Sequence, residues 1–156
     1  MSHLTIGRSA PTFEALDQHG QLIRLEDFKG KKLILYFYPK DQTPGCTTEA
    51  CTFRDQYEEL QEKGFEVVGV SIDPVVSHQK FIQKHQLPFT LLADTDHALV
   101  EAYGVWVEKN MYGKTYMGTA RTTFVIDEKG IIQLIIKKVD NKNAVTQILT
   151  LLDAKS

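Results

Sequence analysis

The chain has 156 residues, of which 42% are hydrophobic and 24% are charged, and this size suits one domain built around a single core. Its formal net charge of −2 and its scattered lysines offer no basic surface for nucleic acid or anionic lipid. No segment has the apolar length of a membrane span. We therefore expect one domain over residues 1–156 that binds neither nucleic acid nor a membrane.

The predicted elements alternate between strands and helices, and each follows from a local pattern. Long apolar runs predict buried strands, Gly64 is placed to end a helix, and Ser77 is placed to cap one. Residues 127–130 form a turn signal between two late strands. In chain order we expect a hairpin around residues 18–20, a strand at 32–38, a helix from 46 to about 63, a strand at 65–72, a helix from 77 to about 85, a strand at 89–93, a helix at 94–103, strands at 123–126 and 131–139, and a helix around 145–152.

Strands that alternate with helices imply a partly parallel sheet covered by helices on both faces, and the late hairpin adds antiparallel strands. The sequence thus predicts an α/β protein with a thioredoxin-like fold, in which helices flank a central mixed β-sheet and an N-terminal β-hairpin precedes it. In such sheets the working residues gather at the carboxyl ends of the strands. Residues 105–118 carry no pattern that predicts an element.

The chain contains two cysteines, Cys46 and Cys51, where a turn passes into the predicted helix. The first N–H groups of a helix have no partner inside it, and the helix dipole adds partial positive charge, so a cysteine there is stabilised as its thiolate. The residues from Met1 to Pro11 lack the basic and apolar regions of a signal peptide, which points to the cytoplasm. In that reducing compartment a cysteine pair is more often catalytic, redox-active or metal-binding than a permanent cross-link.

A helical wheel separates the two cysteines. Cys46 lies on the apolar stripe that faces the core, whereas Cys51 lies about 140° away, among charged side chains that we expect to face solvent: Arg54, Asp55, Glu58 and Glu62. In an unbroken helix, residues five positions apart have Cα atoms roughly 8–9 Å apart, but a disulfide needs less than about 7 Å. If the two cysteines pair, the first turns of the helix must unwind.

Three segments carry a resemblance to a known family. The run from Pro39 to Cys46 (PKDQTPGC) matches the signature P-x-x-x-T-x-x-C, and the runs Gly7 to Phe13 (GRSAPTF) and Arg121 to Asp127 (RTTFVID) fit the same pattern. The chain resembles the peroxiredoxins over nearly its whole length. The continuation through Cys51 is similar to the bacterioferritin comigratory protein or peroxiredoxin Q subgroup. Gln42 departs from this subgroup, which more often has Asn there.

The resemblance implies a role for individual residues. Cys46 would be the peroxidatic nucleophile, and Thr43 would hydrogen-bond the peroxide. Arg121 would face the thiolate, because a guanidinium favours the anion and can hold a peroxide oxygen as charge develops on it. Pro39 would shield the sulfur from solvent, and Glu49 would orient the arginine.

The resemblance also implies the reaction and its partners. Cys46 would attack hydrogen peroxide or an organic hydroperoxide and become a sulfenic acid, which Cys51 would convert to an intramolecular disulfide. An external dithiol would reduce it, with thioredoxin as the expected reductant and glutaredoxin as the alternative. No cofactor and no metal are expected. The Gly-Gly-x-Gly loop and the carboxy-terminal Tyr-Phe extension of dimeric relatives do not occur in the sequence, so we expect a monomer that resists overoxidation.

Two other functions stay open on the residues alone. A thioredoxin-like disulfide oxidoreductase would use C-x-x-C, and the four-residue gap between Cys46 and Cys51 argues against it. A non-enzymatic copper or zinc binder on the same fold would need further ligands. The histidines are spread without ligand spacing and are expected mostly on loops or polar helix faces: His3, His19, His78, His85 and His97. Three aromatic residues can line the entrance to the active site, although such residues more often pack in the core or at its rim: Tyr103, Trp106 and Tyr116.

Overall fold

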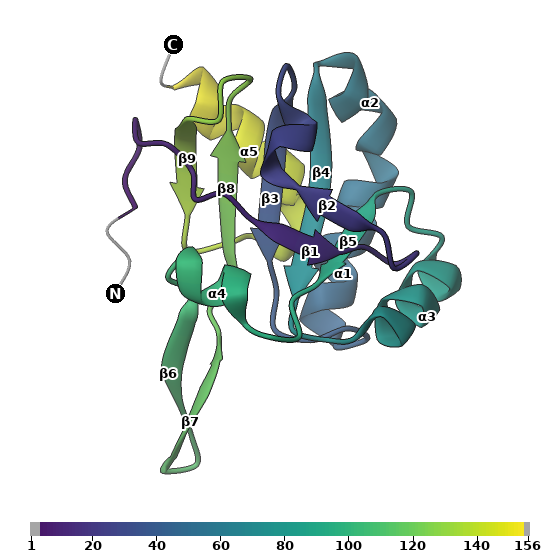
Figure 1. Cartoon of the computed structure of the whole chain (residues 1–156), viewed down its shortest axis with the longest axis vertical. Coiled ribbons are helices and arrows are strands. Elements are labelled where there is room, and N and C mark those ends of the chain that lie inside the picture. The colour runs from purple at the N-terminus through teal and green to yellow at the C-terminus, as the bar shows by residue number, and fades with distance from the viewer. Residues whose placement is uncertain (1–3, 155–156) are drawn as a thin grey trace.

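The computed structural model describes residues 4–154 and shows a twisted sheet with helices on both faces (Figure 1). The strands are β1 (Glu14–Leu16), β2 (Leu22–Arg24), β3 (Lys32–Phe37), β4 (Phe65–Ser71), β5 (Thr90–Ala93), β6 (Trp106–Met111), β7 (Lys114–Thr119), β8 (Thr122–Ile126) and β9 (Ile132–Ile136). The helices are α1 (Pro44–Asp55), α2 (Tyr57–Glu62), α3 (Val75–His85), α4 (Ala98–Ala102) and α5 (Ala144–Asp153), with the 3₁₀ turns η1 (Leu25–Phe28) and η2 (Asn141–Asn143). Among residues 4–154, no helix combines the length and the apolar character needed to cross a membrane.

Seven strands of the described chain form one mixed sheet in the order β2-β1-β5-β4-β3-β8-β9. In its interior β3 runs parallel to β4 and antiparallel to β8, and β4 runs parallel to β5. The hairpin of β1 and β2, joined through residues 17–21, forms one edge. The predicted α/β fold of thioredoxin type, with its mixed sheet and N-terminal hairpin, is confirmed.

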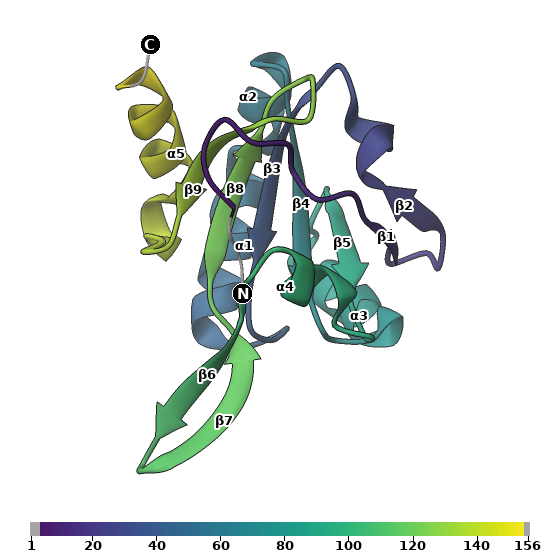
Figure 2. The same ribbon diagram turned by 60° about the vertical axis from the view of Figure 1, so that its left-hand side comes forward.

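Successive side chains of β3 point to opposite faces of the sheet and belong to two separate cores. Ile34 and Tyr36 pack with apolar side chains of α1, α2, α3 and α5, whereas Leu35 and Phe37 pack with side chains of α4 and the N-terminal segment. Figures 1 and 2 show α1, α2 and α5 on one side of the sheet and α4 on the other. Because both faces of β3 are buried from Leu33 onward, its sequence after Lys32 is an unbroken run of large apolar and aromatic residues rather than an alternating one.

The helix that begins at the cysteines is interrupted, so the prediction of one helix up to residue 63 is wrong. Gln56 lies between α1 and α2 with φ −115° and ψ 12°, outside the helical values. The hydroxyl of Tyr57 donates to Glu66 of β4 over 2.6 Å, so α2 is tied to the sheet rather than continuing α1. Gly64 follows α2 with φ +87°, as predicted for a residue that ends a helix.

Two helix starts differ from the prediction. Ser77 does not cap α3, which already begins at Val75, and its hydroxyl instead donates to Asp41 over 2.7 Å. The helix expected over residues 94–103 is confined to α4. Asp94, four residues before the start of α4, stays outside the helix, and its carboxylate accepts the backbone N–H groups of Leu99 and Val100 in the first turn.

Residues 105–118, for which the sequence predicted no element, contribute to the hairpin of β6 and β7. Tyr112 and Gly113 at its tip have φ +54° and +81°, which fits a two-residue turn of type I′. The side chains of residues 110–117 are all exposed, so no apolar alternation marks these strands. In both views the hairpin projects away from the main sheet (Figures 1 and 2).

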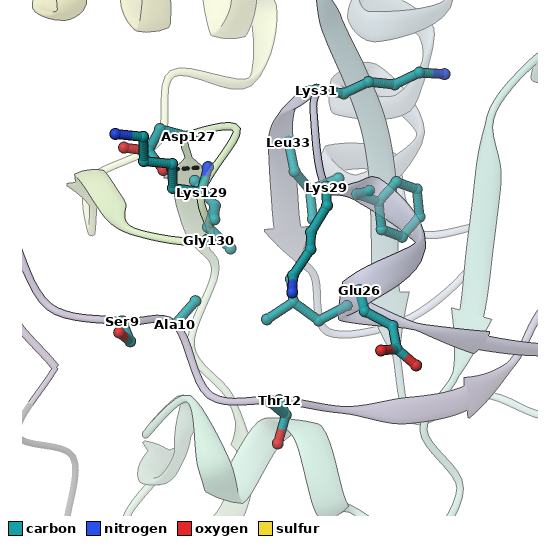
Figure 3. A pocket seen from close by; sticks show the side chains of 13 residues that line it. Ser9, Ala10, Thr12, Glu26, Lys29, Lys31, Leu33, Asp127, Lys129 and Gly130 are labelled. Atoms are coloured by element: carbon teal, nitrogen blue, oxygen red, sulfur yellow. Dashed lines mark hydrogen bonds between the residues drawn. The ribbon is translucent and has the colours of Figure 1, made fainter.

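A hollow of about 250 Å³ lies between η1 and the turn that joins β8 to β9 (Figure 3). It borders Leu33 near the start of β3 and Ile126 at the end of β8, so it lies at the end of the sheet away from the cysteines. Figure 3 shows Lys29 extending along it, and Asp127 at its rim accepts N–H groups of its own turn. None of the predicted site residues lines this hollow.

Candidate active site

The sheet topology brings Cys46 and Arg121 to the same end of two neighbouring central strands, where β3 ends and β8 begins. β3 ends at Phe37 and leads through residues 38–43 into α1, whose first turn holds Cys46. β8 runs antiparallel to β3, with Phe37 opposite Thr122. Arg121, which directly precedes Thr122, therefore lies beside the chain that leaves β3.

Arg121 contacts two side chains of α1 at once. Its Nη2 donates to Sγ of Cys46 over 3.2 Å, and its Nη1 donates to Oε1 of Glu49 over 2.6 Å. Cys46 and Glu49 lie three positions apart and so share one face of the helix, which lets one planar guanidinium reach both. Cys46 is 1% exposed and Glu49 is 0% exposed, so both contacts are made away from bulk water.

The buried pair of Glu49 and Arg121 shifts the ionisation of both partners. Burial raises the pKa of Glu49 to about 7, although the charge and hydrogen bond of Arg121 oppose this change. Burial also disfavours the charged guanidinium, yet Glu49 and Cys46 together raise the pKa of Arg121. Within the described residues, Oε2 of Glu49 is buried without a hydrogen-bond partner, which agrees with a costly desolvation of this carboxyl group. Arg121 is therefore the permanent positive charge at the sulfur.

Gly45 makes room for the guanidinium at the start of α1. A Cβ atom at this position would lie 3.3 Å from Nη2 of Arg121 and 3.2 Å from Nδ2 of Asn141 in η2. Pro44 before it occupies the first helical position, where its fixed φ suits the helix and its missing N–H costs nothing. The Pro-Gly pair thus starts the helix and leaves space beside the cysteine.

Thr43 and Pro39, both predicted for the site, lie in the loop before α1. Thr43 is the N-cap residue of α1, and its hydroxyl donates its proton to the carbonyl oxygen of Lys40 over 2.8 Å. Toward a peroxide the oxygen of Thr43 therefore offers lone pairs and can accept a hydrogen bond. Pro39 is half-buried just beyond β3, and its shielding of the sulfur stays a prediction.

Cys51 lies in the same helix as Cys46, and both thiols are free. α1 runs unbroken between them, which keeps their Cα atoms roughly 8–9 Å apart. The prediction that Cys51 faces solvent is only partly right, because the residue is half-buried and its Sγ lies 4.0 Å from Nδ1 of His85 on α3. A helical wheel describes one helix alone, and α3 reaches this face from another part of the chain.

Asp41, to which the sequence analysis gave no role, is the centre of a buried network. Its carboxylate accepts the hydroxyl protons of Tyr38 over 2.6 Å and of Ser77 over 2.7 Å. Nδ1 of His78 lies 2.7 Å from the same carboxylate. These contacts hold the loop between β3 and α1 against α3, so they position the residues that precede Cys46.

His78 is fully buried, so the general expectation of loops or polar faces fails for this histidine. Its Nε2 lies 2.8 Å from the carbonyl oxygen of Leu92, which only accepts, so Nε2 carries a proton. Its Nδ1 faces the carboxyl group of Asp41, so both ring nitrogens have a hydrogen-bond partner inside the fold. No local signal marks this pair, because 37 positions separate its members.

The other candidate residues take separate places. Tyr103 is buried in the core beside α4, the ring of Trp106 lies 4.4 Å from that of His97, and Tyr116 is exposed on β7. His3 lies outside the described residues. Within residues 4–154, no group of three or more His, Cys, Asp or Glu side chains is arranged to hold a metal ion.

In a fold of thioredoxin type, Cys46 at the start of a helix accepts a hydrogen bond from Arg121 at the start of a strand. These are features of a thiol-dependent peroxidase. Comparison with protein families supports this class, since residues 6–135 match the AhpC/TSA family. The chain therefore belongs to the AhpC/TSA family, and its relatives there are peroxiredoxins.

Two relatives and two solved structures show how similar the chain is. It is 50% identical over 146 residues to "Putative peroxiredoxin bcp" of Coxiella burnetii, which covers 94% of this chain and 97% of the relative. It is 49% identical over 146 residues to "Peroxiredoxin Bcp" of Bacillus subtilis, with 94% and 93% covered. A mutant of the peroxiredoxin Q of Xylella fastidiosa gives a TM-score of 0.92 at 32% identity, with 99% of both chains covered. The bacterioferritin comigratory protein of Xanthomonas campestris gives 0.88 at 35% identity, with 97% and 99% covered. The chain is thus an enzyme, a thiol-dependent peroxidase, as the resemblance implied.

Proposed function

We propose that the chain reduces hydrogen peroxide and organic hydroperoxides through Cys46, with Cys51 as the resolving cysteine and thioredoxin as the reductant. The observation that carries this proposal is the 3.2 Å contact between Nη2 of Arg121 and Sγ of Cys46. A fixed cation beside the sulfur stabilises the thiolate, which is the form of cysteine that attacks.

In the first step the Cys46 thiolate attacks one oxygen of the hydroperoxide. The S–O bond forms as the O–O bond breaks, and the leaving oxygen takes up a proton and departs as water or an alcohol, which leaves a sulfenic acid. Arg121 can donate to the peroxide as negative charge develops, and Thr43 can accept its hydrogen because its own proton is bound to Lys40. Donors that are already oriented in a buried site lower the barrier without reorganisation.

In the second step the sulfur of Cys51 attacks the sulfenic sulfur of Cys46, and water leaves as the disulfide forms. The unbroken helix between the cysteines requires the first turns of α1 to unwind for this step. The external dithiol then reduces the disulfide by exchange and is itself oxidised. Pro39 shields the sulfur in this scheme, and Glu49 holds Arg121 in the orientation that reaches it.

The partners follow from the same scheme. The Xanthomonas campestris relative is described by its alkyl peroxide reduction activity, which supports organic hydroperoxides as substrates here. We place the reaction in the cytoplasm and expect a monomer that needs no metal and no cofactor. Thioredoxin is the preferred reductant, and glutaredoxin is the alternative to be tested beside it.

Peroxide-dependent NADPH oxidation tests this function. Purified protein is mixed with thioredoxin, thioredoxin reductase and NADPH, and the absorbance loss is followed with hydrogen peroxide and with cumene or tert-butyl hydroperoxide. We expect turnover with thioredoxin that disappears when either Cys46 or Cys51 is replaced by serine. Turnover only with glutaredoxin and glutathione would overturn the assigned reductant, and full turnover of Cys46→Ser would overturn the assigned nucleophile.

A further inference from the structure

The half of α1 that carries Cys51 is held by other elements of the fold. Nη1 of Arg54 donates to the carbonyl oxygen of His85 over 2.8 Å, and Oγ1 of Thr52 lies 2.9 Å from two carbonyl oxygens, that of Asn141 in η2 and that of Thr48 in its own helix. Phe53 between them is 0% exposed. These contacts fix residues 51–55 against α3, η2 and the core.

The first half of α1 has one contact that depends on the charge of Cys46. Arg121 binds the sulfur of Cys46 and the carboxylate of Glu49 together. When the sulfur becomes a sulfenic acid it loses its negative charge, and one of the two groups that hold the guanidinium is weakened. Oxidation therefore weakens a contact of residues 44–50 and leaves the anchors of residues 51–55 unchanged.

His85 lies against the half of α1 that stays in place. Its Nδ1 is 4.0 Å from Sγ of Cys51, the outer limit for a hydrogen bond to sulfur, and its ring packs edge-on against Phe81 at 5.4 Å. Burial, Lys84 on its own helix and Arg54 on α1 lower the pKa of His85. A neutral imidazole near pH 7 has a free ring nitrogen that can take a proton from a thiol.

We propose that His85 is a catalytic residue of the resolving step, the base that takes the proton of Cys51. This inference rests on the proposed function of the two cysteines. As residues 44–50 unwind and bring the sulfenic acid to Cys51, the S–H bond of Cys51 breaks and its proton moves to Nδ1 of His85. The S–S bond forms while the S–O bond of Cys46 breaks, and the departing hydroxide takes the proton from His85 and leaves as water.

This role limits how long the sulfenic acid survives. A sulfenic acid that waits for its partner can react with a second peroxide and become a sulfinic acid. Faster formation of the Cys51 thiolate shortens that interval, since the thiolate and not the thiol is the nucleophile. His85 would thus protect Cys46 from overoxidation without touching it.

A single-turnover experiment separates the two steps. Reduced protein is mixed with one equivalent of hydrogen peroxide, quenched in acid at set times, alkylated and analysed by mass spectrometry, which counts thiol, sulfenic acid and disulfide. For His85→Gln at pH 7 we expect an unchanged rate of sulfenic acid formation and disulfide formation slowed about 100-fold, the lower end of the range of general-base catalysis. His19→Gln, an exposed position in the N-terminal hairpin, is the matched control and should behave like the wild type.

The pH dependence distinguishes a base from a structural contact. In the wild type the rate of disulfide formation should be level between about pH 7 and pH 8.5, whereas in His85→Gln it should rise up to about tenfold per pH unit, because without a base the rate follows the hydroxide concentration that forms the thiolate. Added imidazole should partly restore the rate of His85→Ala. Equal rates and equal pH profiles in wild type and variant would overturn the proposal. A wild-type rate that itself rises tenfold per pH unit would also overturn it, and this measurement needs no variant. Loss of sulfenic acid formation in the wild type would instead count against the proposed function of Cys46.

Discussion

Arg121 donates a hydrogen bond of 3.2 Å to the sulfur of Cys46, although 75 positions separate the two residues in the chain. The contact exists because β3 and β8 are antiparallel neighbours, so the end of one strand meets the start of the other. Gly45 leaves the space that the guanidinium occupies. The fold thus places a permanent cation at the one thiol that lies in the first turn of α1.

Replacing Arg121 should slow the reaction of Cys46 with peroxide. Arg121→Gln removes the charge beside the sulfur and the donor to the peroxide, and we expect the second-order rate constant to fall about 100- to 1000-fold, as when one oriented donor is lost from an active site. Stopped-flow oxidation of the reduced protein measures this constant. Arg121→Lys keeps the charge but cannot reach Cys46 and Glu49 together, so it should lie between the wild type and Arg121→Gln. A rate within twofold of the wild type for Arg121→Gln would contradict the assigned role.

Glu49 should make the free energy of unfolding depend on pH. Its pKa rises from 4.5 to about 7 on folding, so the native state holds a proton that the unfolded chain releases between these values. The contribution of this proton to the free energy of unfolding is fully present below about pH 4.5 and is lost as pH rises through 7. At about 1.4 kcal/mol per pKa unit, this contribution amounts to about 3 kcal/mol.

Glu49→Gln isolates this effect because the amide cannot ionise. The stability of the wild type relative to Glu49→Gln should fall between pH 5 and pH 8, and urea unfolding at each pH measures the difference. Other carboxyl groups titrate in both proteins and cancel in the comparison. Parallel stability curves for the two proteins would show that Glu49 is ionised throughout.

Asp41 should be worth several kcal/mol to the fold. In Asp41→Ala the side chains of Tyr38, Ser77 and His78 lose their shared partner, and each buried polar group left without a hydrogen bond costs about 1–3 kcal/mol. Thermal or urea unfolding measures the loss. Glu14→Ala, which removes the exposed pair of Glu14 and Arg24, should cost less than about 1 kcal/mol. Similar losses for the two variants would contradict the network described for Asp41.

Gln42 is strained, and relieving the strain should stabilise the protein. Its φ is +67°, a left-handed conformation that costs roughly 1–2 kcal/mol for a residue with a side chain and that Asn tolerates better. Gln42→Gly should therefore raise the free energy of unfolding by about 0.5 kcal/mol after the entropy cost of glycine. Gln56→Gly, at an ordinary φ of −115°, should lower it by about 0.5–1 kcal/mol. Changes of the same sign would refute the strain at Gln42.

The elements that the sequence predicted well are those whose burial leaves a local pattern. The strand predicted at residues 32–38 is apolar or aromatic from Leu33 onward because helices and loops cover both its faces. Gly64 follows α2 because its backbone conformation there, with φ +87°, suits glycine. β6 and β7 escaped prediction because their exposed side chains have no buried face to mark. The interruption at Gln56 escaped it because α2 is tied to the sheet through the contact of Tyr57 with Glu66.

The residues of the site also fall into two groups, those that a sequence pattern predicted and those that only tertiary packing brings to their partners. Cys46, Thr43 and Arg121 lie in segments whose patterns pointed to the family, and the structure brings Cys46 and Arg121 into contact. His78 and His85 both lie on α3, and each meets its partner, Asp41 or Cys51, only through tertiary packing. Spacing along the chain cannot predict such contacts, since 34 positions separate Cys51 from His85.

The unequal roles of the two cysteines are tested most directly by counting the peroxide that each serine variant consumes in the absence of reductant. Reduced Cys51→Ser should consume one equivalent of hydrogen peroxide in the first turnover and carry a sulfenic acid at Cys46, whereas reduced Cys46→Ser should consume none on the same timescale. Mass spectrometry of both variants, trapped with a sulfenic-acid reagent, gives the count. Peroxide consumption by Cys46→Ser, or its absence in folded Cys51→Ser, would contradict the assignment of Cys46 as the nucleophile.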